Sequence, residues 1–219
     1  AYAVQAWVAL ALISAGLLCV MAKIGHPGRA LNAMRHADTS WMTRELLTVP
    51  FIYLGVLAVL QPSGPAWLAA APALAALGFL YCQARILAAS RGIPVWSEPA
   101  IVPLVVVMGL TEGAALSAGL FALASGSASA PLLVLLAGLL VLRQVAWTRY
   151  RSALVVRPAA VRARAVLDRF ARHFAIFGQT SPALLAVAAL TIGEAAGVWL
   201  SMLAGLLALA GGWALKHTL

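Results

Sequence analysis

Long apolar runs constrain the fold of this chain more than any other feature of its sequence. Runs of about 15 to 24 apolar residues recur along all 219 positions, and a helix of this length can cross a membrane. Hydrophobic residues make up 63% of the chain and charged residues only 10%, which excludes an ordinary soluble domain. The alternation of a β-barrel is absent, so the sequence predicts an all-α integral membrane protein.

Seven membrane-spanning helices account for these runs. We place them at about residues 4–22, 45–60, 67–89, 100–123, 131–149, 180–194 and 199–215. The last two share one apolar stretch, Ser181 to Leu215, which as a single helix of about 52 Å would overshoot a hydrocarbon core of about 30 Å. The polar sequence Gly193–Gly197 interrupts this stretch, so we expect the chain to turn back there. Residues 1–219 are expected to form a single transmembrane domain.

Basic residues are confined to alternate connections between these helices. The first, third and fifth connections and the tail carry lysine or arginine, whereas the second, fourth and sixth carry none. The basic connections are therefore predicted to share one side of the membrane, which the positive-inside rule makes the cytoplasmic side. A net charge of +9 distributed in this way does not indicate a nucleic-acid partner.

The fifth connection, residues 150–179, is long and has the periodicity of a helix. Its apolar residues recur every three or four positions, at Ala160, Ala163, Leu167, Phe170, Phe174 and Phe177. Arginines fill the positions between them, so we predict an amphipathic helix at the membrane surface. Two roles stay open for it: anchoring to lipid, or docking of a soluble partner subunit.

Glu45 is the most informative ionisable residue, because it opens a membrane span without an obvious partner. Met42 cannot complete a capping box with it, and Val49, one helical turn further on, is apolar. Ionisable residues at membrane depth are functional candidates by default. A structural salt bridge is the alternative, and its candidate partners are Lys23, His26, Arg29 and Arg85.

The residues around Glu45 suit a quinone head group. Histidine titrates near neutral pH, so His26 can donate to a quinone carbonyl and exchange protons, although a solvated histidine is the plainer interpretation. Trp41 can stack on a quinone ring, but tryptophan is also common at membrane interfaces. Arg85 and Trp96 lie on the same side and can complete such a site, unless they are only a snorkelling arginine and an ordinary turn.

Two further charges, Glu112 and Arg143, lie deep in apolar runs. Each is 13 residues from the nearer end of the neutral turn Ser125–Ala130, so both lie about 20 Å from that side of the membrane. Matching depth on neighbouring helices predicts a buried ion pair. Cys19 and Cys82 lie in apolar spans and are expected to act as small hydrophobic residues, and no span carries the facing histidines of a haem b site.

Three short motifs resemble a known family. They are Gly25-His26-Pro27-Gly28-Arg29-Ala30, then Thr39-Ser40-Trp41-Met42-Thr43-Arg44-Glu45, and Arg85 followed by Pro94 and Trp96. Over about residues 1–110 the chain resembles the membrane-anchor subunits of the dimethyl sulfoxide reductase type, within the wider polysulfide-reductase-like group. The family usually has eight spans, so the resemblance implies a further span before Ala1.

The resemblance implies a quinone-reactive anchor without haem or any other metal of its own. Menaquinone or ubiquinone would be the quinone, and the partners would be a ferredoxin-like iron–sulfur subunit and a catalytic subunit with a molybdenum or tungsten pterin. The family's acidic quinone-site residue falls on Glu45, while its histidine is replaced by Lys23, and His26 stands one turn further on. The residues that would line the quinone site are Arg29, Trp41, Arg44, Arg85 and Trp96.

The charge pattern and the resemblance together place the quinone loops and the partner subunits on the cytoplasmic side of a bacterial inner membrane. Two short segments are similar to those of anchors in phenylacetyl-CoA:acceptor oxidoreductase-like complexes. They are residues 94–99, which include Trp96-Ser97-Glu98-Pro99, and Gly193–Gly197. The first alternative function is a small transporter or channel without a redox role. The second is a purely structural anchor, which would leave Glu45 and Arg85 unexplained.

Overall fold

Helices form the whole regular structure of the computed structural model over the residues that it describes, 2–23, 38–61 and 66–219. Seven helical segments of these residues are long and apolar enough to cross a membrane. They are Tyr2–Lys23, Trp41–Val59, Ala70–Ala88, Ile101–Ser125, Ala130–Val155, Pro158–Thr191 and Glu194–Thr218. The prediction of an all-α membrane protein with about seven spans is therefore confirmed.

The helices group into two compact units, which we describe separately. The N-terminal unit is Tyr2–Ile86 and the C-terminal unit is Leu87–Leu219. The boundary falls near the end of helix α4 (Ala70–Ala88). A single domain over the whole chain stays a prediction.

The N-terminal unit contains α1 (Tyr2–Lys23), α3 (Trp41–Val59), the short 3₁₀ segment η2 (Ala66–Ala69) and α4. Helix α3 begins four residues before the predicted span because Ser40 caps it: the Ser40 hydroxyl accepts a hydrogen bond from the Thr43 amide at 3.4 Å. The hydroxyls of Ser14 and Tyr53 join α1 to α3 at 2.5 Å.

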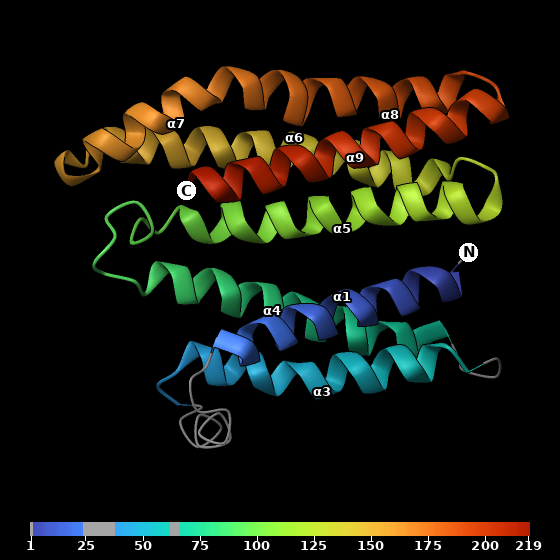
Figure 1. Cartoon of the computed structure of the whole chain (residues 1–219), viewed down its shortest axis with the longest axis horizontal. Coiled ribbons are helices and arrows are strands. Elements are labelled where there is room, and N and C mark those ends of the chain that lie inside the picture. Colours follow the sequence, from blue (N-terminus) through green and yellow to red (C-terminus); the bar gives the residue numbers. More distant parts are fainter. Residues whose placement is uncertain (1, 24–37, 62–65) are drawn as a thin grey trace. The chain divides into compact units, whose positions relative to one another are not determined.

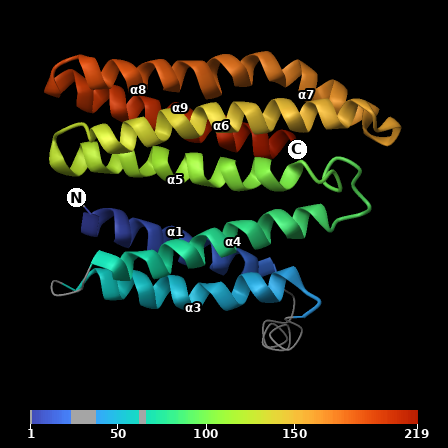
Figure 2. The same ribbon diagram turned by 180° about the vertical axis from the view of Figure 1, so that it is seen from behind.

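The C-terminal unit is a bundle of four long helical segments. Helix α9 (Glu194–Thr218) packs against α5 (Ile101–Ser125) and α8 (Ser181–Thr191), and α6 (Ala130–Val155) packs against the same two (Figures 1 and 2). One part of its core is rich in alanine and leucine, and the other contains the large buried side chains of Trp147, Tyr150 and Phe174.

Contacts between the connections of the C-terminal unit show which of them share an end. The Trp96 indole donates to the Leu219 carbonyl at 2.9 Å, and Arg157 pairs with the buried Glu98 at 2.6 Å. The third connection, the fifth connection and the C-terminus therefore lie together, as the alternation of basic loops predicted. Helix α8 ends at Thr191 and α9 begins at Glu194, so the predicted reversal before the last helix is also confirmed.

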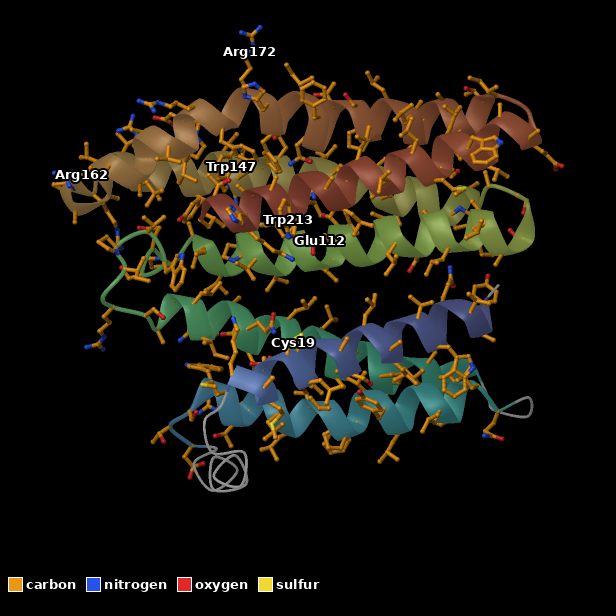
Figure 3. The ribbon with its side chains drawn as sticks, in the orientation of Figure 1. Cys19, Glu112, Trp147, Arg162, Arg172 and Trp213 are labelled. Atoms are coloured by element: carbon orange, nitrogen blue, oxygen red, sulfur yellow. The ribbon has the colours of Figure 1, made fainter. Side chains whose placement is uncertain are left out.

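The predicted amphipathic segment is not a separate loop between helices. Its first residues complete α6, and the short 3₁₀ segment η3 (Pro158–Ala160) follows. Helix α7 (Val161–His173) comes next and continues through the π-helical segment η4 (Phe174–Thr180) into α8. Leu167 and Phe174 are buried against the bundle, while Arg162 and Arg172 are exposed and reach away from it (Figure 3). At about 1.5 Å per residue the continuous segment Pro158–Thr191 is longer than a hydrocarbon core of about 30 Å. The location of α7 in the interface stays a prediction.

A glycine makes the close packing of α5 against α9 possible. A Cβ atom at Gly205 would stand 2.6 Å from the Ala115 carbonyl oxygen, which belongs to the backbone and cannot move aside. Gly113, in the middle of α5, has open space around the position of its missing Cβ.

We expect Gly205→Ala to destabilise the C-terminal unit, because the new methyl group forces α5 and α9 apart. We expect Gly113→Ala to leave the stability unchanged or to raise it by up to about 1 kcal/mol, since alanine is the better helix former. Thermal unfolding in detergent would compare the two variants. Equal melting temperatures would contradict the close approach at Gly205.

Candidate functional site

An aromatic ring with two guanidinium groups lies where α3 begins. The Arg44 guanidinium carbon is 4.4 Å from the centre of the Trp41 ring, and that of Arg85, from α4, is 4.7 Å from it. Tyr81, one turn before Arg85 on α4, meets the Trp41 ring edge-on at 5.7 Å between centroids. The structure thus brings together Trp41, Arg44 and Arg85, three of the predicted quinone-site residues, and adds Tyr81.

The Glu45 carboxylate lies half-buried on α3, one residue after Arg44. Its Oε1 accepts a hydrogen bond at 3.0 Å from the side-chain amide of Gln83 on α4. No described lysine, arginine or histidine forms an ion pair with it. Because Ser40 caps the helix, Glu45 is not needed as a cap, so neither capping nor a salt bridge with a described residue explains this carboxylate.

One donor of the cluster is left without a partner. Arg85 Nε is buried and makes no hydrogen bond to any described residue. A buried donor of this kind costs free energy unless a ligand or water satisfies it. An unsatisfied donor and a nearby carboxylate are groups that a quinone head uses, the first as a hydrogen-bond donor to a carbonyl and the second as a proton-exchanging acid. The residues present therefore fit a quinone.

The other predicted quinone-site residues have different positions. Lys23 is exposed at the end of α1, in the same unit as Glu45. His26 and Arg29 lie outside the described residues. Trp96 belongs to the C-terminal unit, where its indole nitrogen already donates to the Leu219 carbonyl and its ring packs on the aromatic core.

The prediction of a direct ion pair between Glu112 and Arg143 is wrong, because each residue contacts other partners. Glu112 on α5 accepts from Lys216 on α9, while no ion pair to Arg143 occurs among the residues that the structure describes. Lys216 lies near the C-terminal end of α9, and its ammonium group contacts Glu112 on α5. The prediction compared only the depths of Glu112 and Arg143 and did not consider this lysine. Figure 3 shows Glu112 on α5 beside α9.

Arg143 is fully buried and held by neutral acceptors. Its Nε donates to Gln179 Oε1 at 3.1 Å, its Nη1 to the Ala208 carbonyl at 3.1 Å, and its Nη2 to the Gly178 carbonyl. Its guanidinium carbon also lies 5.4 Å from the centre of the Phe174 ring. The cation is thus shared among α6, η4 and α9, and its role in the described structure is to join these elements.

Gly212 on α9 keeps the two charges near each other although they do not pair. A Cβ atom there would collide with Glu112 Oε1 and would stand 3.2 Å from Arg143 Nη1. Glu112 Oε1 itself is buried without a hydrogen-bond partner in the described structure. The two side chains therefore lie near each other at Gly212, whereas each charge has another partner.

Four polar residues of these sites were not predicted from the sequence. Gln83, Tyr81, Gln179 and Lys216 contact the predicted residues from other helices. Gln83 had a usable signal, since it is the only amide in the apolar run of residues 66–88. Gln179 had none, because its role depends on the π-helical turn.

Metal ligands do not gather in the described part of the chain. No group of three or more histidine, cysteine, aspartate or glutamate side chains there could hold a metal ion. Cys19 and Cys82 are both unpaired thiols, the first exposed and the second buried.

These features define a polytopic helical membrane protein that holds ionisable side chains within its helix packing. The sequence matches the DMSO reductase anchor subunit family (DmsC) over residues 2–212. The chain therefore belongs to this family, and it is a membrane anchor subunit of an oxidoreductase complex.

A curated relative agrees with this assignment. The C subunit of the sulfite dehydrogenase of Allochromatium vinosum is 30% identical over 135 residues, which are 53% of this chain and 42% of the relative. The match therefore spans less than half of the relative's length. No solved structure matches this chain significantly.

Proposed function

We propose that this anchor exchanges electrons and protons with a quinone or quinol at the cluster of Trp41, Arg44, Arg85 and Glu45. The observation that carries the proposal is the unsatisfied Arg85 Nε beside the Trp41 ring, near a carboxylate that, among the described residues, accepts from the neutral Gln83. Family membership supports it, since the chain is an oxidoreductase anchor. The quinone, when bound, supplies the two-electron, two-proton chemistry.

Each residue of the cluster has a separate task in this proposal. Trp41 holds the guanidinium groups of Arg44 and Arg85 against its ring, and the Arg85 guanidinium donates to one carbonyl oxygen. Glu45 gives a proton to the head group or takes one from it, and Gln83 orients the carboxylate through the hydrogen bond to Oε1. Lys23, at the end of α1, and His26 are the proposed proton links to water.

The proposed partners are a ferredoxin-like iron–sulfur subunit and a catalytic subunit carrying a molybdenum or tungsten pterin. The similarity to one subunit of a sulfite dehydrogenase supports an assembly with several subunits. The exposed arginines of α7, among them Arg162 and Arg172, offer a basic surface for a soluble subunit. This surface lies at the same end of the C-terminal unit as the ion pair Arg157–Glu98.

We propose that this basic end faces the cytoplasm of a bacterium and that the complex resides in the inner membrane. A reporter fused after Ser127, in the neutral turn, should then behave as periplasmic, and one fused near Arg157 as cytoplasmic. Alkaline phosphatase and a fluorescent protein at the two positions would measure this. The reverse pattern would overturn the proposed orientation.

Trp41→Leu tests the quinone cluster. The substitution removes the surface on which both arginines lie, and each cation–π contact contributes about 0.5–2 kcal/mol. We expect the apparent Michaelis constant for a short-chain quinol or quinone to rise about tenfold, corresponding to about 1.4 kcal/mol. Turnover with an artificial dye that bypasses the anchor should persist.

Trp199→Leu is the matched control, because Trp199 is an exposed tryptophan on α9 of the other unit. It should change neither activity. Equal loss of quinone-linked and dye-linked turnover in Trp41→Leu would indicate failed assembly and would refute a role in quinone binding.

A further inference from the structure

A small polar groove lies between α6 and α7, apart from the sites described above. Its volume is about 220 Å³, less than the about 300–1,000 Å³ of a whole small-molecule site, so it has room for a polar head group rather than for a complete ligand. Five of its six lining side chains are polar. They are Thr148, Arg151 and Ser152 from α6 and Arg164 and Asp168 from α7, and the sixth is Val155.

Asp168 holds two guanidinium groups at this groove. Arg151 Nε donates to Asp168 Oδ1 at 3.2 Å, and Arg151 Nη2 contacts the same oxygen. Arg164 Nε lies 3.5 Å from the other oxygen, Oδ2. The Arg151 guanidinium carbon also lies 5.6 Å from the centre of the Trp147 ring. Both cations are thus kept at one carboxylate, which positions them for a shared ligand.

Donors and positive charge remain available in the groove. Among the described residues, neither Arg151 Nη1 nor the two Nη groups of Arg164 make a hydrogen bond. The side chains of Arg151 and Arg164 are 33% and 39% exposed, so a ligand can reach these donors. Two cations and one carboxylate leave one positive charge. Guanidinium groups bind phosphate oxygens through paired N–H donors, so a phosphodiester, with its single negative charge, suits the groove.

The order of side chains along α6 matches the order of groups in a phospholipid. Val141, Val145, Thr148 and Ser152 are spaced by four, three and four residues, which places them on one side of the helix. The two valines are 62% and 41% exposed and offer an apolar surface to acyl chains. The two hydroxyls follow, and then Arg151, as the glycerol and the phosphate follow the acyl chains in the lipid.

The groove lies where the membrane-spanning part of α6 ends. Arg151 follows Ala130, the first residue of this helix, by 21 positions, or about 32 Å at about 1.5 Å per residue. The hydrocarbon core is about 30 Å thick, and charged side chains are costly inside it. With its two arginines and its aspartate, the groove therefore belongs to the layer of the lipid head groups.

We propose that this groove binds the head of an anionic phospholipid such as phosphatidylglycerol. The phosphodiester accepts from Arg151 Nη1 and from the Nη groups of Arg164, and the acyl chains lie along Val145 and Val141. The remaining positive charge selects a head of negative net charge over phosphatidylethanolamine or phosphatidylcholine, whose ammonium groups cancel the phosphate charge. The site uses no residue of the quinone cluster and does not rest on the proposed function.

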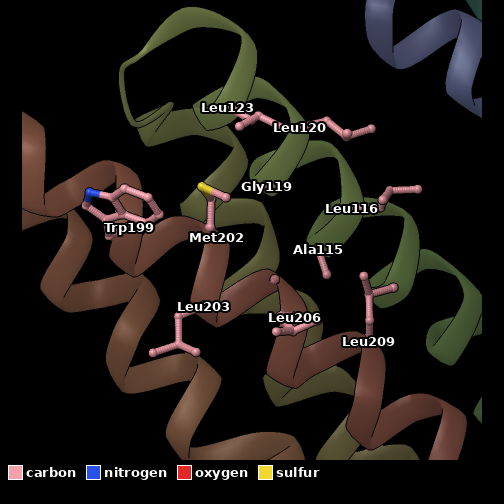
Figure 4. A pocket seen from close by; sticks show the side chains of 11 residues that line it. Ala115, Leu116, Gly119, Leu120, Leu123, Trp199, Met202, Leu203, Leu206 and Leu209 are labelled. Atoms are coloured by element: carbon pink, nitrogen blue, oxygen red, sulfur yellow. The ribbon is translucent and has the colours of Figure 1, made fainter.

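A groove between α5 and α9 provides an internal comparison (Figure 4). Its volume is about 400 Å³, and only apolar side chains and glycines line it, among them Leu116, Trp199 and Leu206. Acyl chains fit this groove, but no charged side chain lines it. It should therefore not distinguish one head group from another.

Photolabelling of the whole complex in phosphatidylcholine vesicles tests the proposal. Three probes in trace amounts carry the same photoactivatable acyl chain and differ only in the head: phosphatidylglycerol, phosphatidylethanolamine and phosphatidylcholine. Mass spectrometry identifies the labelled peptides. We expect phosphatidylglycerol to label the peptides of the α6–α7 groove about fivefold more than the other two, as expected from one basic charge. The three probes should label the α5–α9 groove equally.

Three variants locate the site. Arg164→Gln removes the excess charge and should lower the phosphatidylglycerol label about fivefold. Val155→Trp fills the groove without altering a charge and should lower it as well, which keeps the test valid if Arg164→Gln assembles poorly. Arg169→Gln is the matched control, because Arg169 is exposed on α7 about 140° around the helix from Arg164 and does not line the groove. It should leave the label unchanged.

Equal labelling of the α6–α7 groove by all three lipids would overturn the proposal. So would equal losses in Arg164→Gln and Arg169→Gln, which would indicate attraction to the basic surface in general. Stronger labelling by phosphatidylethanolamine would mean that Asp168 binds an ammonium group, and loss of the label in millimolar inorganic phosphate would indicate a site for a soluble anion. Either result would also contradict an anionic lipid site.

Discussion

Quinone-linked turnover of the complex is expected to fall about 100-fold or more when Glu45 is replaced by glutamine, because general acid–base groups contribute about 10²–10⁴-fold to such reactions. The glutamine has the same shape and keeps a carbonyl oxygen for Gln83, whose amide donates to Glu45 Oε1 at 3.0 Å. What it loses is the proton that the carboxyl group can give or take. Turnover with an artificial dye should persist in the same membranes.

Two control variants make this experiment specific. Glu45→Asp keeps a carboxyl group and should retain more quinone-linked turnover than Glu45→Gln. Glu194→Gln changes an exposed carboxylate at the start of α9 and should have no effect on either activity. If Glu45→Gln reduced dye-linked and quinone-linked turnover equally, Glu45 would serve assembly and the proposed proton transfer would be wrong.

The fold was predictable because the membrane imposes it. Apolar length alone identified the seven spans, and the break before Glu194 followed from a segment too long for one crossing. The helix starts were less accurate, since the Ser40 cap extends α3 toward its N-terminus. The sequence predicted a surface helix followed by a separate span, whereas α7 continues into α8 through η4. The change from arginine-rich to apolar sequence suggested the end of a helix, but both kinds of sequence belong to one helical segment.

The candidate site was predictable only in part. The sequence motifs named Trp41, Arg44 and Arg85, and the structure brings them together. Gln83 and Tyr81 were missed because contacts across helices depend on rotation about the helix axis, which depth does not determine. The same limit explains why Glu112 contacts Lys216 rather than Arg143, and why the π-helical placement of Gln179 left no signal in the sequence.

The largest loss of stability is expected from Arg143→Met. Methionine fills much of the volume but donates no hydrogen bond, so the acceptors on Gln179, Ala208 and Gly178 lose their shared donor. Each buried acceptor left unsatisfied costs about 1–3 kcal/mol. Removal of the buried charge offsets part of this cost, as replacements of buried ion pairs by apolar residues have shown.

We expect the net free energy of unfolding to fall by at least about 3 kcal/mol, as estimated from three lost acceptors. The measurement is the melting temperature of the purified anchor, together with the amount of assembled complex in the membrane. Arg143→Lys should be intermediate, because an ammonium group has no planar fork with which to reach three acceptors at once.

Arg151→Met is the matched control, two turns further along the same helix. Its ion pair with Asp168 is partly exposed, with side-chain exposures of 33% and 39%, and pairs of this kind contribute about 0–1 kcal/mol. A large difference between the two variants is therefore expected in the same assay. If Arg143→Met were as stable as Arg151→Met, the polar network around Arg143 would not hold α6, η4 and α9 together, and the buried arginine would have to be explained by function instead.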